Sequence, residues 1–109
     1  MNISSTCEDG KLIISLSGEL DHHAAKNAIP QISETVNYEF PTKIILDFSG
    51  INFMDSSGIA LVIGAFKRSK NLGCDFCVVN VSRQAYKVFD AAGLCKLINI
   101  ATKEAAIAK

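Results

Sequence analysis

The strongest constraint on the fold is a pair of apolar runs separated by a short polar segment. Residues 44–48, Ile-Ile-Leu-Asp-Phe, have the length and hydrophobicity of a buried strand. Residues 59–63, Ile-Ala-Leu-Val-Ile, begin a segment that continues to Asn71. Its first two turns are apolar on nearly every side, as expected of a deeply buried helix. The polar segment between the two runs, residues 52–58, is predicted to be a loop.

The N-terminal part of the chain predicts a hairpin. Residues 2–8 form a weak, polar strand, and residues 11–17 form a second strand that places alternate apolar side chains on one face. Between them, Asp9-Gly10 is a strong signal for a tight turn. We therefore expect the two strands to pair antiparallel, with the first at the edge of the sheet.

A helix is predicted after this hairpin. Asp21 is suited to be its N-cap, and apolar residues recur at helical spacing as far as about Asn37. Pro30 interrupts this pattern because it lacks the N–H group that an internal turn needs. We therefore expect Pro30 to kink or locally break the helix.

The rest of the chain alternates strands and helices. After the 43–48 strand and a helix at 56–71, Ser82 caps a helix that Gly93 ends, and Thr102 caps a last one. We expect further strands at 76–81 and 97–100, and the last helix at 103–108. This order predicts a single α/β domain over residues 1–109. Its sheet is mixed but mostly parallel, with about five strands including the N-terminal antiparallel hairpin, and with about four helices.

In such a sheet, functional residues gather at the carboxyl ends of the parallel strands. The loops at residues 19–23 and 52–57 both follow predicted strands, so they are expected to emerge on one edge. The candidate functional residues on that edge are Asp21, His22, His23, Asp55, Ser56 and Ser57.

Composition excludes several partner classes. Formal net charge is zero, so the basic stripe of a nucleic-acid binder and the polybasic segment of a membrane-surface module are both missing. No apolar run approaches the ~20 residues of a membrane span. The N-terminus lacks the pattern of a signal peptide. We therefore expect a cytoplasmic protein that binds neither nucleic acid nor membranes.

The cysteines, Cys7, Cys74, Cys77 and Cys95, are predicted to be structural thiols. Cys74 and Cys77 form a C-x-x-C pair, but it enters an apolar strand instead of opening a helix, where a redox pair usually lies. Residues three apart on a strand point to opposite faces. A zinc site would need a second pair of ligands. We expect no metal and no cofactor.

Residues at the predicted edge of the sheet could in principle form two kinds of reactive site, a serine hydrolase and a phosphoacceptor aspartate. The sequence argues against both. A serine hydrolase would pair Ser56 or Ser57 with His22 or His23, but the nucleophile-elbow pattern is absent. Adjacent helical histidines also point about 100° apart, which argues against a shared metal as well. A phosphoacceptor at Asp47 would need a clustered acidic pair and a lysine on a later strand, and neither is in place.

Two interpretations of Ser56 stay open. Hydroxyls at the start of a helix are ordinary capping residues. The same position can receive an anion, because free N–H groups and the positive end of the helix dipole face it. Phosphorylation of Ser56 would add about −1.5 to −2 charges at neutral pH. A partner that covers the serine would lose more than a hundredfold in affinity if that charge cost ~3 kcal/mol of binding.

Three motifs in this chain closely resemble the STAS-domain anti-sigma-factor antagonists. They are Gly-Glu-Leu-Asp-His-His at residues 18–23, Phe-Met-Asp-Ser-Ser-Gly at 53–58 and Phe-Asp-Ala-Ala-Gly-Leu at 89–94. The resemblance covers almost the whole chain and is nearest to the sporulation type that frees sigma factor F. Three features depart from the family pattern: Ile59-Ala60, Pro30 and Cys95.

The resemblance implies a non-catalytic protein that is switched by phosphorylation of Ser56. Its unphosphorylated form would bind an anti-sigma factor, which is also the ATP-dependent serine kinase, and so release the sigma factor. A metal-dependent serine phosphatase would reset it. The resemblance implies that the partner-binding residues are Asp21, His22, Asp55, Ser56, Ser57 and Gly58. The alternative is a STAS subunit with a structural or adaptor role in a transporter or stress-signalling assembly.

Overall fold

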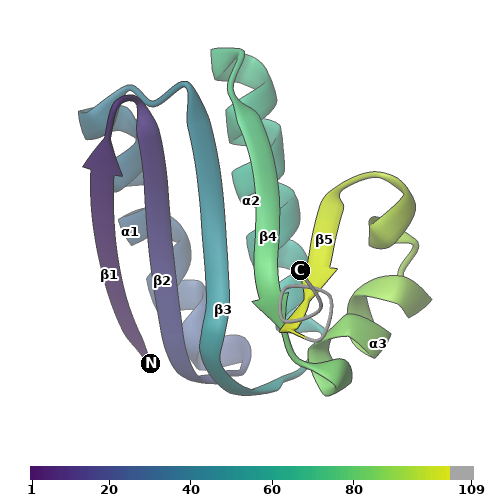
Figure 1. Cartoon of the computed structure of the whole chain (residues 1–109). Coiled ribbons are helices and arrows are strands. Elements are labelled where there is room, and N and C mark those ends of the chain that lie inside the picture. The colour runs from purple at the N-terminus through teal and green to yellow at the C-terminus, as the bar shows by residue number, and fades with distance from the viewer. Residues whose placement is uncertain (104–109) are drawn as a thin grey trace.

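Five strands form one sheet in the order β1-β2-β3-β4-β5 (Figure 1). The structure, a computed structural model, describes residues 1–103. As the sequence predicts, β1 pairs antiparallel with β2, and all other neighbouring strands pair parallel. The described elements are β1 (Asn2–Glu8), β2 (Lys11–Leu20), α1 (His22–Glu39), β3 (Lys43–Met54), α2 (Ser57–Leu72), β4 (Asp75–Val81), α3 (Arg83–Ala91), the 3₁₀ helix η1 (Leu94–Lys96) and β5 (Asn99–Thr102).

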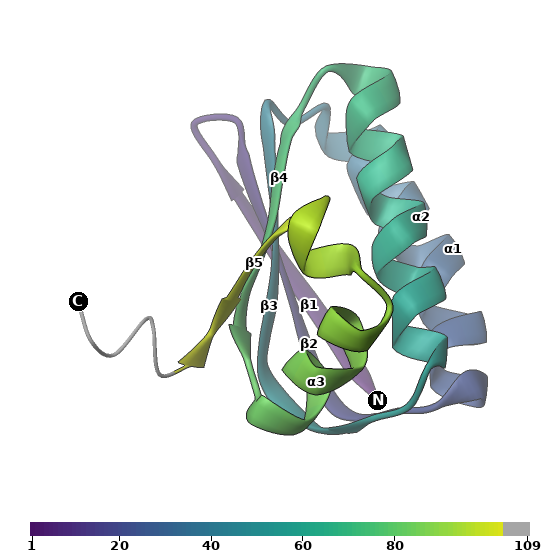
Figure 2. The same ribbon diagram turned by 90° about the vertical axis from the view of Figure 1, so that its right-hand side faces the viewer.

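The helices cover one face of the sheet. Figure 2 shows α1, α2 and α3 on the same side, and the core lies between them and the strands. Ile14, Leu46 and Val78, from the three central strands, are 0% exposed there. α3 adds Phe89, whose ring centroid lies 5.9 Å from that of Phe48 on β3. None of the described helices has both the length and the apolarity needed to cross a bilayer.

α1 begins where the sequence predicts. Asp21 is its N-cap, and one carboxylate oxygen accepts a hydrogen bond from the Ala24 N–H at 2.9 Å. The helix is continuous to Glu39, so of the expected kink or local break at Pro30, the break does not occur. Pro30 lies on the exposed side of the helix. Water can therefore satisfy the carbonyl group that the missing N–H leaves unpaired.

The main correction to the predicted fold is the length of β3. Residues 52–54, expected in a loop, are the end of this strand, and β2 likewise continues to Leu20. The two extensions pair with each other, Leu20 opposite Met54, and both side chains are fully buried. Register shifts begin after Ser15 and interrupt the alternation of buried and exposed residues. The sequence pattern of period two is therefore lost in this part of both strands.

The C-terminal region also differs from the prediction. η1 was not expected, and β5 occupies residues 99–102 instead of 97–100. The N–H groups of Leu97 and Ile98 both bond the Leu94 carbonyl oxygen, at 3.0 and 2.8 Å, so this apolar pair closes the 3₁₀ turn and does not mark a strand. Apart from Lys103, the helix expected at 103–108 falls outside the described residues. Within residues 1–103 there are three α-helices, where about four were predicted for the whole chain.

Candidate functional site

The two loops predicted to share an edge do so. Leu20 and Met54 are paired at the ends of parallel strands, and the next residues, Asp21 and Asp55, begin the two loops. The Asp55 N–H donates a hydrogen bond to the Leu20 carbonyl oxygen at 3.2 Å. The carboxyl ends of β2 and β3 thus bring the Asp21 and Ser56 loops side by side, as the sequence predicts.

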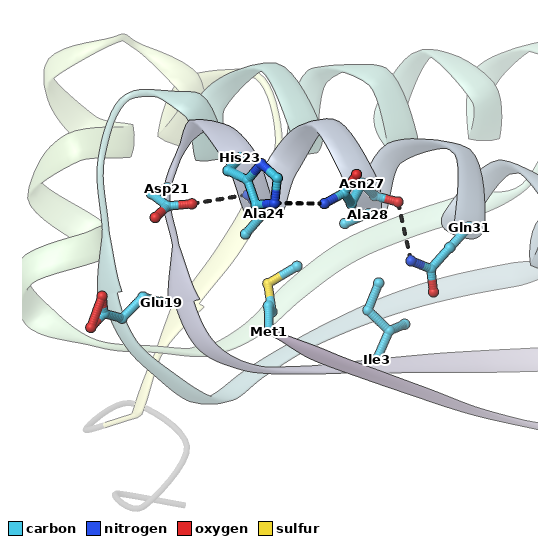
Figure 3. A pocket seen from close by; sticks show the side chains of 9 residues that line it. All are labelled: Met1, Ile3, Glu19, Asp21, His23, Ala24, Asn27, Ala28 and Gln31. Carbon is cyan, nitrogen blue, oxygen red and sulfur yellow. Dashed lines mark hydrogen bonds between the residues drawn. The ribbon is translucent and has the colours of Figure 1, made fainter.

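The Asp21 side of this edge opens into a hollow between α1 and β1 (Figure 3). Asp21 and Glu19 lie at one end of it, and Gln31 lies at the other. His22 and His23 are both exposed, as expected of first-turn histidines. The Nε2 atom of His23 lies 3.3 Å from the amide nitrogen of Asn27, one turn along the helix.

The Ser56 side begins α2, but Ser56 does not cap this helix with its hydroxyl. Its backbone is already helical, with φ −63° and ψ −14°, whereas a capping side chain normally comes from an extended residue. Asp55 takes the capping role instead. Its Oδ1 accepts the Ser57 N–H at 2.8 Å, and its carbonyl oxygen accepts the Gly58 N–H at 3.1 Å. Ser56 is exposed, and its hydroxyl is left available for chemistry.

Gly58 is required by close packing beneath this loop. It is buried, and a Cβ atom at this position would lie 2.6 Å from the Met54 Cγ and closer still to the Met54 sulfur. The absence of a side chain therefore allows the first turn of α2 to pack directly on the end of β3.

Ser56 also borders a shallow groove between the start of α2 and α3. The groove is lined by Ser56, Ile59, Lys87, Val88, Ala91 and Ala92. Most of these side chains are small or apolar, and Lys87 adds one positive charge. Asp21 is not among the residues that line this groove. It lines the hollow shown in Figure 3. Asp21 and Ser56 therefore share an edge of the molecule but not a cavity.

Sequence reasoning missed Gln84, which lies on α3. Its side-chain amide makes two hydrogen bonds to the backbone of Met54: Nε2 donates to the carbonyl oxygen at 2.7 Å, and Oε1 accepts the N–H at 3.1 Å. No sequence pattern marks such a contact, because it joins residues 30 positions apart and depends on where β4 ends.

The other chemistries weighed from the sequence find no support in the described residues. No group of His, Cys, Asp or Glu within residues 1–103 could hold a metal ion. The histidine that lines a hollow, His23, faces the α1–β1 side, whereas Ser56 borders the α2–α3 groove. Among the described residues, no hydrogen bond joins His22 or His23 to Ser56 or Ser57, the contact that a serine hydrolase needs.

Asp47 has a structural role. Burial alone would raise the pKa of its carboxyl group, but hydrogen bonds from Asn80 and Ser49 and the charge of Lys103 outweigh burial. The pKa of Asp47 is therefore held below its usual value. The Asn80 amide donates to it at 3.0 Å and the Ser49 N–H at 2.9 Å, so Asp47 joins β3 to β4.

The four cysteines are free thiols. Burial raises the pKa of Cys74 and of Cys77, the opposite of what a redox-active C-x-x-C pair requires. The Cys74 thiol donates to the Pro41 carbonyl oxygen at 2.9 Å. These two thiols have the structural surroundings that the sequence predicts.

Comparison with known proteins identifies the family. The STAS domain family matches residues 2–107. The chain belongs to the STAS domain family. This agrees with the resemblance carried by the three motifs, and it accounts for the order of strands and helices along the chain.

STAS proteins similar to this chain include named regulators of sigma factors. It is 38% identical to the anti-sigma F factor antagonist of Lysinibacillus sphaericus over 88% of this chain and 82% of that protein. It is 34% identical to that of Paenibacillus polymyxa, over 87% of this chain and 81% of that protein.

Two solved structures of proteins named SpoIIAA, one unphosphorylated and one phosphorylated, resemble this one. The anti-sigma factor antagonist SpoIIAA in its unphosphorylated form is 34% identical, covers 97% of this chain and 93% of its own, and has a TM-score of 0.78. SpoIIAA of Bacillus in its phosphorylated form has a TM-score of 0.70, with 97% and 96% covered. The sporulation-type STAS resemblance seen in the sequence is thereby confirmed.

Proposed function

We propose that this STAS protein is an anti-sigma-factor antagonist, which in its unphosphorylated form binds an anti-sigma factor and so releases the sigma factor. The names of its relatives support this function, and their link to sigma F supports a role in sporulation. For the site, one observation carries the proposal. Ser56 is exposed, its hydroxyl does not cap α2, and it lies on the same edge as Asp21.

Phosphorylation of Ser56 switches this binding off. The phosphate adds about −1.5 to −2 charges at a helix N-terminus, whose dipole and free N–H groups favour an anion. The fold can therefore tolerate the charge. A partner seated over the apolar groove beside Ser56 cannot, because it would have to desolvate a dianion.

The neighbours of Ser56 have distinct roles in this proposal. Asp55 holds the start of α2, and Gly58 allows that turn to lie against β3. Ser57 donates its N–H to Asp55, and this contact fixes the backbone that follows Ser56. Asp21 and His22 present the adjacent loop to the same partner.

The partners are those that the family resemblance implies. The anti-sigma factor is itself the ATP-dependent serine kinase, and a metal-dependent serine phosphatase removes the phosphate. The protein has a binding function and performs no catalysis of its own. Because sigma factors act on RNA polymerase, this protein would carry out the proposed function in the cytoplasm.

Phosphosite mapping tests the proposal. The protein is incubated with its cognate anti-sigma factor and ATP, and the modified residue is located by mass spectrometry. We expect phosphate on Ser56 alone. The Ser57→Ala variant is the matched control: it is still phosphorylated at Ser56, whereas Ser56→Ala accepts no phosphate.

Phosphate on another residue, with Ser56 unmodified, would refute the site. Copurification with membrane or scaffold subunits, irrespective of phosphorylation, would instead support the structural or adaptor role.

A further inference from the structure

We infer that Gln84 is a positioning residue for the Ser56 loop: its side-chain amide replaces the strand that is missing beside the end of β3. This inference rests on the proposed phosphorylation of Ser56. It adds a residue on α3 that determines where the hydroxyl is presented.

Among the described residues, no strand pairs with the end of β3 on its α3 side. Asp55 directs its N–H toward β2, so the N–H and C=O of Met54, one residue earlier, face the opposite side. On that side, pairing between β3 and β4 ends at Asp47 opposite Val79. The Gln84 amide bonds both Met54 groups, at 2.7 and 3.1 Å, as a parallel strand would.

Gln84 is itself held in place by its helix. The Ser82 hydroxyl caps α3 by accepting the Ala85 N–H at 3.1 Å. Further along α3, Phe89 is fully buried against Phe48 of β3. The amide therefore projects from an anchored element, although much of the Gln84 side chain is exposed to solvent.

The contact reaches Ser56 through a short, fixed piece of backbone. Met54 is bonded to Gln84, Asp55 is bonded to Leu20, and the Asp55 carboxylate is bonded to the N–H of Ser57. Ser56 lies between these fixed residues and borders the groove that α3 forms. Releasing Met54 from α3 would let the hydroxyl move relative to the surface on which a kinase docks.

Such movement affects the rate of phosphoryl transfer more than binding. Transfer requires the hydroxyl within a near-attack distance of the phosphate, and small misplacements cost rate steeply. The docking groove itself keeps its residues. Loss of the Gln84 contact is therefore expected to lower kcat of phosphorylation at Ser56 and to leave KM unchanged.

Two substitutions separate hydrogen bonding from packing. Gln84→Met keeps the length of the side chain and removes the amide, whereas Gln84→Glu keeps an acceptor for the Met54 N–H and loses the donor. Gln31→Met is the matched control. Gln31 is an exposed glutamine on α1 whose amide donates only within its own helix, to the Asn27 carbonyl oxygen.

Amide hydrogen exchange and kinase kinetics are then measured on the whole protein. In Gln84→Met, exchange at the Met54 amide is expected to be about five- to tenfold faster, as for loss of one hydrogen bond. Its kcat with the cognate anti-sigma kinase is expected to fall about tenfold, with KM within about twofold. Gln84→Glu should lie between this variant and the wild type, and Gln31→Met should match the wild type.

Unchanged exchange at Met54, or unchanged kcat, would overturn the inference. A raised KM with unchanged kcat would also overturn it, because Gln84 would then be a contact for the kinase. If the wild-type protein itself accepts no phosphate at Ser56, the proposed function fails, and exchange at Met54 and Ser57 alone decides whether Gln84 positions this loop.

Discussion

Three junctions between described elements lead from a strand into an α-helix, and one of them is built differently. At the starts of α1 and α3, the N-cap residue is extended, and its own side chain caps the helix: Asp21 bonds Ala24, and Ser82 bonds Ala85. At the start of α2, Ser56 is already helical and makes no cap bond, because Asp55 caps the helix one residue earlier.

The difference gives the side chains at these junctions different roles: Asp21 and Ser82 stabilise their helices, whereas Ser56 is available for modification. A hydroxyl that accepts a cap bond is held by the helix, and modifying it would remove that bond. By moving the capping role to Asp55, the α2 junction leaves Ser56 exposed on the first turn of its helix. Both junctions have a serine at the start of the helix, but Ser56 follows an acidic residue, Asp55, whereas Ser82 follows Val81. The acidic neighbour therefore decides which serine can serve as a switch.

The largest expected effect is the effect of charge at Ser56 on binding to the anti-sigma factor. Without this effect, the difference between Ser56 and the two capping residues would have no functional meaning. We predict that Ser56→Ala binds the anti-sigma factor as tightly as the unmodified protein, whereas Ser56→Asp binds more than about a hundredfold more weakly, a loss of ~3 kcal/mol. Calorimetric titration of both variants measures this. Equal affinities would show that charge at this position does not control binding.

The next effect tests the packing under the Ser56 junction. Gly58→Ala places a Cβ against the Met54 side chain, and we expect a net loss of about 1–2 kcal/mol of unfolding free energy. Gly64→Ala, in the same helix, meets no atom within 4 Å and should instead stabilise by about 0.5–1 kcal/mol. Urea denaturation compares the two. A shift of the same sign in both would contradict the close approach at Gly58.

Removing the side chain at each helix start tests directly whether Asp21 and Ser82 cap their helices and Ser56 does not. Asp21→Ala and Ser82→Ala should each lower the unfolding free energy by about 1 kcal/mol, because each removes a side-chain cap. Ser56→Ala should change it by less than about 0.5 kcal/mol, as for an exposed residue without structural contacts. Denaturation midpoints decide this. If Ser56→Ala proved as costly as Ser82→Ala, the hydroxyl would be a cap after all.

The smallest effect lies away from these junctions, at Asp47. Its pKa is lowered in the folded protein, so its contribution to stability is complete above the ordinary value of 3.8 and is lost as pH falls through the lower folded value. Because the side chain is partly exposed, we expect only a fraction of about 1 kcal/mol. Denaturation at decreasing pH should show a shallower acid loss for Asp47→Asn than for the wild type.

Much of the fold could be predicted from local patterns. The hairpin, the alternation of strands and helices, and the Asp21 cap each depend on residues close together in the sequence. The meeting of the Asp21 and Ser56 loops followed from one topological rule about parallel strands.

The remaining features depend on contacts that no local pattern contains. Residues 52–54 were predicted to be loop because irregular register hides their pairing with β2. The Ser56 hydroxyl was expected to be suited to capping, but it makes no cap bond, and the Asp55 carboxylate accepts the Ser57 N–H instead. Gln84 could not be recognised because its role requires that β4 stop short of Met54.

The most direct test of the account is the stability of the protein before and after phosphorylation of Ser56. A free hydroxyl at a helix N-terminus should accept the charge without loss, so the unfolding free energy should stay equal or rise by up to about 1 kcal/mol, while binding to the anti-sigma factor is lost. A fall of several kcal/mol, with binding lost through unfolding, would contradict it.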